Sequence, residues 1–205
     1  MAILVLDPTA EDRRRIRHRQ ECGGDRYDEV WDRVYVVAPL ANNEHQYFVF
    51  QIATAIGSAI RVPDDGWVFP GCNVSDQPAK WKKNYRCPDV AVFLKSNPAE
   101  DRGSFWFGGP DFAVEIVSPK DRIRDKLGFY FAVGVRELLI VDRNPWKLGL
   151  YRNDGSALAL VGVCPAKKPQ TLASDVIPFQ FSLANGMPRP TLLVTRTTDG
   201  QTTRI

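Results

Sequence analysis

Two short apolar runs restrict the folds open to this chain more than any other feature of its sequence. They are Asp89–Leu94 and Phe112–Val117, and Glu137–Val141 is a third run of the same kind. Such nearly continuous apolar segments are typical of strands that are covered on both faces. We therefore expect an α/β fold in which helices pack against a central mixed β-sheet.

Three segments carry the signals of helices. Residues 9–21 predict a polar helix that begins at a capping residue and ends at a Gly-Gly pair. A long helix with a broad apolar stripe is expected to begin at Asn43, which would form a capping box with Gln46 and end before Pro63. The third helix is expected from about Asp121 to Val133.

Turn signals predict additional β-hairpins. Residues 27–38 are rich in β-branched and aromatic residues and would turn near Asp32-Arg33. The dipeptides Asp154-Gly155 and Asp199-Gly200 stand between strand-like segments, where such pairs favour tight hairpin turns. We therefore expect hairpins at the beginning and end of the chain beside the central sheet.

Length and composition indicate one domain. The 205 residues are 44% hydrophobic and carry no internal repeat or linker, so we expect a single domain over residues 25–205 after a helical extension over residues 1–24.

No apolar run approaches the ~18–20 residues that span a bilayer. We expect a soluble, cytoplasmic protein with no membrane partner. The four Cys residues form no C-x-x-C pair, and with two His residues a zinc or multi-histidine site is not expected.

Acidic residues within apolar strands are the clearest candidates for chemistry. Glu115 is the one charged residue in its run, and Asp89 opens the other run directly after Pro88. A carboxylate in a dry strand is costly unless it is paired or binds a metal. Glu115 and Asp89 on adjacent strands would make a cation site, whereas a single acid of this kind is often just ion-paired.

Lys126 is the basic residue placed to join these acids. On a helical wheel it lies about 60° from Ile123, at the edge of the apolar stripe. Its stem could lie along the sheet while its ammonium reaches the strand ends. The alternatives are a surface lysine or a structural partner of Glu115.

These residues together resemble a known family, the Uma-type restriction endonucleases of the PD-(D/E)XK nuclease superfamily. The resemblance covers roughly residues 25–165. Its motifs are Asp28-Glu29-Val30-Trp31-Asp32, Pro39, Glu44-His45-Gln46, Pro88-Asp89, Glu115-Ile116-Val117-Ser118-Pro119, Asp125-Lys126, Tyr130, Gly134-Val135, Glu137 and Ile140-Val141-Asp142.

The resemblance implies a restriction-endonuclease-like fold and a set of roles. Asp89 and Glu115 would bind Mg²⁺, with Mn²⁺ as a substitute, and Lys126 would stand in for the superfamily lysine. That lysine usually lies two residues after the glutamate, where this chain has Val117, so here it would have moved to the following helix. Glu29 matches an upstream glutamate and would be a further catalytic acid. The family usually has Gly at the position of Arg33.

The implied function is a Mg²⁺-dependent endonuclease that hydrolyses phosphodiester bonds of DNA, acting as a homodimer by analogy with the superfamily. Paired carboxylates can hold Mg²⁺ with open positions for water and phosphate oxygen. Lys126 would position water and phosphate, because a lysine in an acidic site stays protonated. The alternatives are a nuclease-fold protein that binds nucleic acid or a protein partner without cutting, and a structural protein whose acids are ion-paired.

A basic segment leads directly into Pro88-Asp89. Its residues Lys82, Lys83 and Arg86 are expected beside the metal, where they would contact the phosphate backbone, and Trp81 and Tyr85 could stack on an unpaired base. A solvated loop is the plain alternative. His45 lies in the first turn of the long helix, where it would either line the rim of the nucleic-acid cleft or belong to the helix cap.

Overall fold

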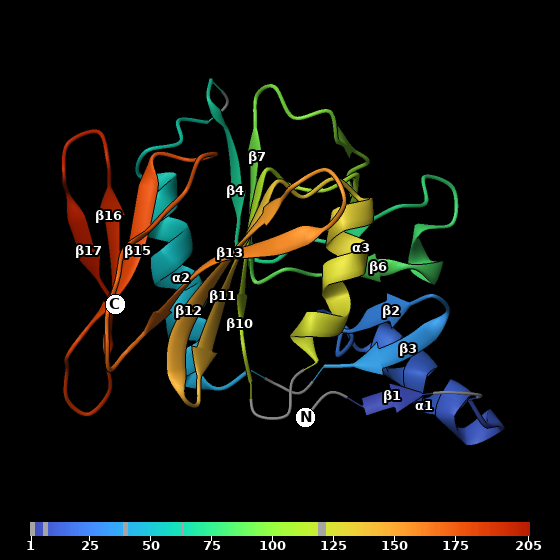
Figure 1. The fold of residues 1–205 in the computed structure, drawn as a ribbon. Helices are drawn as coiled ribbons and strands as arrows, with labels where there is room; N and C mark the ends of the chain where they lie inside the picture. Colours follow the sequence, from blue (N-terminus) through green and yellow to red (C-terminus); the bar gives the residue numbers. More distant parts are fainter. Residues whose placement is uncertain (1–2, 6–7, 39–40, 63, 119–121) are drawn as a thin grey trace.

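A mixed six-stranded sheet forms the centre of the molecule (Figure 1). The computed structural model describes residues 3–5, 8–38, 41–62, 64–118 and 122–205. In spatial order the strands are β13 (Leu158–Pro165), β12 (Trp146–Asn153), β11 (Glu137–Arg143), β10 (Phe112–Ile116), β7 (Val90–Leu94) and β4 (Gly66–Phe69). The pair β10 and β11 is parallel and the other neighbours are antiparallel. The predicted buried strands and central mixed sheet are therefore confirmed.

Helices cover both faces of this sheet. The long helix α2 (Asn43–Gly57) lies on one face, where Phe48, Ile52 and Ile56 belong to the same buried cluster as alternate residues of β7 and β10. On the other face lie the 3-10 turn η2 (Ile123–Lys126) and the short helix α3 (Leu127–Ala132), whose Ile123 and Tyr130 are buried. The strands are apolar on both faces because both faces are covered.

A second sheet of seven short strands lies beside the central sheet. Its spatial order is β1 (Ile3–Val5), β3 (Val34–Val37), β2 (Glu29–Trp31), β6 (Tyr85–Arg86), β5 (Val74–Ser75), β9 (Trp106–Phe107) and β8 (Glu100–Asp101). The predicted turn between β2 and β3 is confirmed, with φ angles of 47° at Asp32 and 73° at Arg33. A positive φ favours glycine, so Asp32 and Arg33 adopt a backbone conformation that residues with a side chain rarely take.

The N-terminal segment contains both a helix and a strand. Helix α1 (Ala10–Glu21) begins with the predicted capping box of Thr9 and Asp12, and none of its side chains is buried. Strand β1 pairs with β3, so this segment adds a strand to the second sheet. The expected boundary near residue 24, between an N-terminal extension and the main domain, stays a prediction.

A third sheet closes the α2 side of the core. It consists of β14 (Leu172–Ala173), β15 (Phe179–Ala184), β16 (Thr191–Arg196) and β17 (Thr202–Arg204). Phe179 and Phe181 are buried in one cluster with Phe48 of α2. Both predicted hairpins form, with positive φ at Gly155 and Gly200.

Two helix boundaries differ from the predicted ones. Asn42 caps α2, one residue before the expected Asn43, and its side chain accepts a hydrogen bond from the His45 amide. The helix ends at Gly57, and Pro63 lies outside the described residues. In place of the expected helix 121–133, the structure has a 3-10 turn followed by a short α-helix. Asp121, the expected first residue, also lies outside the described residues. None of the helices in the described ranges is long and apolar enough to cross a membrane.

Candidate active site

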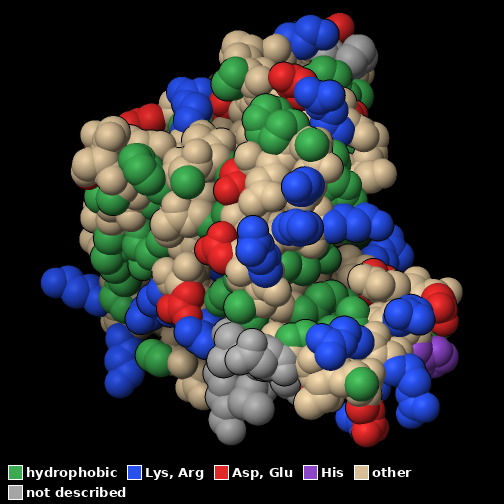
Figure 2. Space-filling model, turned by 90° about the vertical axis from the view of Figure 1, so that its right-hand side faces the viewer, with side chains coloured by type: hydrophobic (Ala, Val, Ile, Leu, Met, Phe, Trp, Pro, Cys, Tyr) green, Lys and Arg blue, Asp and Glu red, His purple; other side chains and the backbone are tan. Residues whose placement is uncertain are grey.

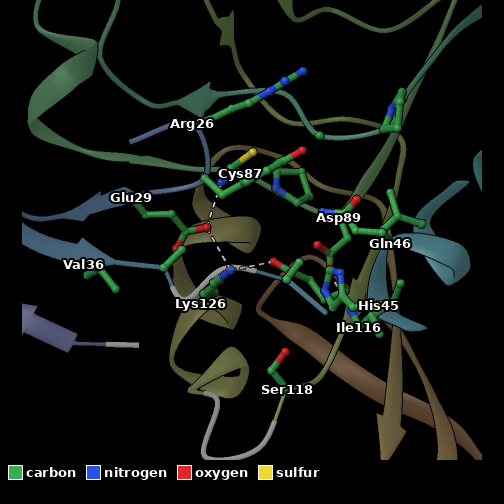
Figure 3. Close-up of a pocket in the computed structure, with 18 of the residues that line it drawn as sticks. Arg26, Glu29, Val36, His45, Gln46, Cys87, Asp89, Ile116, Ser118 and Lys126 are labelled. Carbon is green, nitrogen blue, oxygen red and sulfur yellow. Dashed lines mark hydrogen bonds and ion pairs between the residues drawn. The ribbon is translucent and has the colours of Figure 1, made fainter. Parts of the chain in front are cut away.

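A cavity of about 320 Å³ lies where the central and second sheets meet. The carboxylates Glu29, Asp89 and Glu115 line it together with Lys126 and His45. Figure 3 shows Glu29 and Val36 of the second sheet on one side of the cavity and His45 and Gln46 of α2 on the other. The structure thus brings all four predicted catalytic residues to one place.

Strand register places Asp89 and Glu115 together. Strands β7 and β10 are antiparallel neighbours, with Val90 opposite Val114. The next positions along this register are Asp89 and Glu115, and side chains opposite each other in an antiparallel pair share a face. The Ile116 amide also donates to Oδ2 of Asp89 at 2.7 Å, which fixes that carboxylate at the end of β10.

Lys126 bridges two of the carboxylates. Its Nζ lies 2.9 Å from Oε1 of Glu115 and 2.9 Å from Oε1 of Glu29, and the residue is 8% exposed. Residues 123–126 form a 3-10 turn and not the α-helix assumed for the predicted wheel angle, so Lys126 lies on the same side of the turn as the buried Ile123. Lys126 therefore connects an acid of the central sheet with an acid of the second sheet.

Three further residues hold the carboxylates in place. Trp31 Nε1 donates to Oε2 of Glu29 at 2.6 Å, and the Cys87 amide donates to its Oε1 at 2.8 Å. The Tyr130 hydroxyl donates to Oε1 of Glu115 at 2.5 Å. Tyr130 belongs to the motifs of the resemblance, but no role in the site was assigned to it from the sequence. Its place four residues after Lys126, on the same helical face, is the signal that links it to the site.

Burial controls the ionisation of this group. Burial, together with the charges of Asp89 and Glu29, raises the pKa of Glu115 to about 8, although Lys126 acts in the opposite direction. Burial alone would lower the pKa of Lys126, but Glu115 and Glu29 outweigh it and raise this pKa above its usual value. The ammonium therefore stays charged, while Glu115 holds a proton near neutral pH unless a bound cation displaces it.

His45 contacts the third carboxylate. Its Nε2 lies 3.2 Å from Oδ2 of Asp89, and its buried Nδ1 has no hydrogen-bond partner in the described part of the chain. Asn42 provides the helix cap, so the imidazole is free to face the cavity. Glu44 points elsewhere and pairs with Arg143 and Arg189. Of the two interpretations of His45, the structure favours a residue of the cavity wall.

The basic segment divides into exposed and buried residues. Lys82 and Lys83, in the 3-10 turn η1 (Trp81–Lys83), are exposed, but they do not line the cavity. The predicted contact of Arg86 with the phosphate backbone does not fit the structure, because Arg86 is 4% exposed. Its guanidinium lies over the rings of Trp31 and Phe129 and donates to the Val30 carbonyl at 2.8 Å.

The donor set fits a hard divalent cation. Within the described residues, Oδ1 of Asp89 and Oε2 of Glu115 accept no hydrogen bond, so each carboxylate keeps one oxygen available. No three His, Cys, Asp or Glu side chains of that part of the chain converge on one point. This arrangement suits Mg²⁺, which commonly binds through one or two carboxylates and keeps several waters or phosphate oxygens.

Comparisons with known proteins agree with this fold. The Uma2 family, described as "Putative restriction endonuclease", matches residues 13–186, most of the chain. A solved structure from Anabaena variabilis, described as a putative nuclease belonging to DUF820, superposes with a TM-score of 0.54. The identity is 17%, and the match covers 72% of this chain and 80% of that chain. The expected nuclease-like α/β fold is thereby confirmed. Curated proteins provide no match.

Proposed function

The chain belongs to the Uma2 family of restriction endonucleases, and from this premise we propose that it is a Mg²⁺-dependent endonuclease that hydrolyses phosphodiester bonds of DNA. One observation supports this most strongly. Three carboxylates, Glu29, Asp89 and Glu115, line one cavity around a single ammonium, Lys126. Buried negative charge in excess of its partners is costly unless a cation or a proton joins it.

Each residue has a distinct role in this proposal. Asp89 and Glu115 would hold Mg²⁺ through their available oxygens, and Mn²⁺ would substitute. When bound, the cation supplies charge neutralisation at the phosphate and a more acidic water. Lys126, which stays protonated, orients the attacking water and the phosphate. Both oxygens of Glu29 already accept hydrogen bonds, so its role is to orient Lys126.

Exposed basic side chains supply the surface for the DNA backbone. Figure 2 shows the side of the molecule on which α1 and β6 lie, and Lys and Arg side chains gather there with fewer acids between them. Lys82 and Lys83, in the turn η1 shortly before β6, are exposed. We extend the proposal to a homodimer, which would be detected by light scattering of the purified protein.

Glu115→Gln tests the proposed metal role. The substitution keeps the size of the side chain and removes the charge that would hold the cation. We expect Mg²⁺-dependent cleavage of DNA to be abolished while DNA binding is retained, because the basic surface is unchanged. Calorimetric titration with Mg²⁺ and Mn²⁺ should show loss of binding. Undiminished cleavage by this variant would refute the role of Glu115.

Lys126→Ala separates catalysis from structure. We expect metal binding to persist and cleavage to fall by about 10²–10³-fold, the scale for removing one preorganised electrostatic contact. The variant also leaves Glu29 and Glu115 without their shared cation, which should cost about 3–5 kcal/mol of stability. Cleavage is therefore measured well below the unfolding midpoint of the variant. Cleavage that survives under those conditions would show that Lys126 is a structural partner only.

A second function rests on the same ion pairs. Lys126 satisfies two buried acids, an arrangement that would also stabilise a nuclease fold that binds nucleic acid or a protein partner without cutting. Metal binding without cleavage of any DNA would favour this alternative. Absence of metal binding at millimolar concentration would favour a purely structural ion-paired cluster.

A further inference from the structure

The walls of the cavity differ in character from its acidic floor. Tyr27, which precedes β2, and Phe50, on α2, both line the cavity. They are 39% and 63% exposed, so their rings remain accessible from solvent. Trp31, Val36 and Val49 extend this apolar lining. The cavity is thus lined both by carboxylates and by exposed aromatic residues that come from two separate segments of the chain.

Exposed aromatic residues are concentrated at this cavity. In the described ranges, the exposed large aromatic residues are Tyr27, Tyr47 and Phe50, and two of these line it. Single exposed apolar residues need no explanation, but aromatic rings gathered beside a polar site indicate a ligand with an apolar face. A nucleobase is such a ligand, because every base offers a flat π-surface.

The aromatic residues that the sequence suggested for base stacking are already engaged. Trp81 stacks on Phe105 with a centroid separation of 5.0 Å and an interplanar angle of 14°. Tyr85 is buried and contacts the edge of the same indole. These rings pack within the protein, whereas Tyr27 and Phe50 stay exposed beside the carboxylates.

A basic group stands next to one of the exposed rings. The guanidinium of Arg26 lies 5.8 Å from the Tyr27 ring centroid, and Arg26 also lines the cavity. Arg26 is exposed, so it can contact a phosphate on the strand that carries the base. The mouth of the cavity therefore offers an aromatic surface for a base and a cation for its backbone.

We propose that the cavity accepts the base of an unpaired nucleotide, which stacks on Tyr27 and Phe50, so that the preferred substrate is single-stranded DNA. A cavity of about 320 Å³ is at the small end of ligand sites and suits one nucleotide-sized group. A base inside a duplex is stacked and paired, and it cannot reach such walls without being extruded. The inference rests on the proposed nuclease function and specifies its substrate.

Binding without divalent cations tests the inference directly. The wild-type protein is titrated with a single-stranded oligonucleotide that contains 2-aminopurine and with a hairpin in which the same base is paired. We expect fluorescence quenching and tighter binding with the single strand. Tyr27→Ala and Phe50→Ala should each weaken single-strand binding by about 5- to 100-fold, the range for losing one stacking contact.

Tyr47→Ala is the matched control. Tyr47 is an exposed aromatic residue of the same helix as Phe50, 44% exposed, but it does not line the cavity. Its loss should leave single-strand binding unchanged. Equal affinity for paired and unpaired DNA, or equal effects of Phe50→Ala and Tyr47→Ala, would overturn the inference.

Cleavage is measured separately with Mg²⁺, so that the two proposals fail in different ways. Binding that depends on Tyr27 and Phe50 without cleavage of any DNA would overturn the nuclease function and support the nucleotide site. Cleavage of duplex and single-stranded DNA at equal rates, with no effect of either aromatic substitution, would support the nuclease function and overturn the nucleotide site.

Discussion

Glu115 shows how one buried side chain links stability with cation binding. It accepts hydrogen bonds from Lys126 and Tyr130, yet burial and the nearby carboxylates raise its pKa to about 8. Near neutral pH a proton therefore competes with any cation for this carboxylate. The usual pKa of a glutamate in an unfolded chain is near 4.5.

This difference predicts the pH dependence of stability. Between about pH 4.5 and 8 the folded protein binds more protons at Glu115 than the unfolded chain, so the free energy of unfolding falls as pH rises. The contribution of one group is at most about 1.4 kcal/mol per pH unit. Urea unfolding without metal should show this decline in the wild type relative to Glu115→Gln. A wild-type protein that gains stability relative to the variant over this range would contradict the raised pKa.

At the scale of elements, the basic segment 80–86 has one part at the surface, in the turn η1, and another part in the interior, in strand β6. Lys82 and Lys83 are exposed on the turn, whereas Arg86 enters the interior, where it donates to backbone carbonyls and stacks on two rings. The surroundings change along this run because η1 lies at the surface, whereas β6 pairs with β2 and β5 inside the second sheet and both of its residues are buried.

Substitutions in this run should have opposite consequences. Lys82→Ala and Lys83→Ala should change stability by no more than ~0.5 kcal/mol and, if they contact phosphate, reduce the salt slope of DNA binding by about 0.7–0.9 each. Arg86→Ala should instead lower the free energy of unfolding by about 3–5 kcal/mol, as for other large-to-small core changes. Thermal unfolding and binding at several salt concentrations measure both. A stable Arg86→Ala protein with an altered salt slope would mean that Arg86 reaches the surface.

On the scale of the whole molecule, one continuous core joins the central sheet with the C-terminal sheet. Phe112 of β10 stacks on Phe181 of β15 at 5.5 Å between centroids, and both belong to the cluster that contains α2. Because α2 carries His45 at its first turn, the C-terminal sheet supports one wall of the cavity from behind. We therefore expect the central and C-terminal sheets to unfold together.

Phe181→Ala tests this continuity. Because the Phe181 ring is fully buried, its truncation should lower the free energy of unfolding by about 3–5 kcal/mol. Circular dichroism and tryptophan fluorescence should report the same urea midpoint in the wild type and the same lower midpoint in the variant. Separate transitions for the two probes would show that the C-terminal sheet unfolds on its own.

Local chemistry made much of this protein predictable from its sequence. The capping box of Thr9, the turns at Gly155 and Gly200 and the double-sided burial of β7 and β10 depend on neighbours along the chain. Each of these rests on a short-range rule that a single sequence contains. The sequence also placed Asp89 and Glu115 in two buried strands, whereas their union with Lys126 in one site was implied by the family resemblance.

Tertiary structure alone decided the features that depend on contacts between distant segments. Arg86 belongs to a basic run, but the rings of Trp31 and Phe129 from elsewhere in the chain place it in the interior. Glu29 joins the site because Lys126, 97 residues away, reaches it. Tyr27 and Phe50 meet at one cavity because two sheets and a helix converge there. Periodicity along one segment contains no information about such packing between segments, and this is why the aromatic walls were not predictable from the sequence.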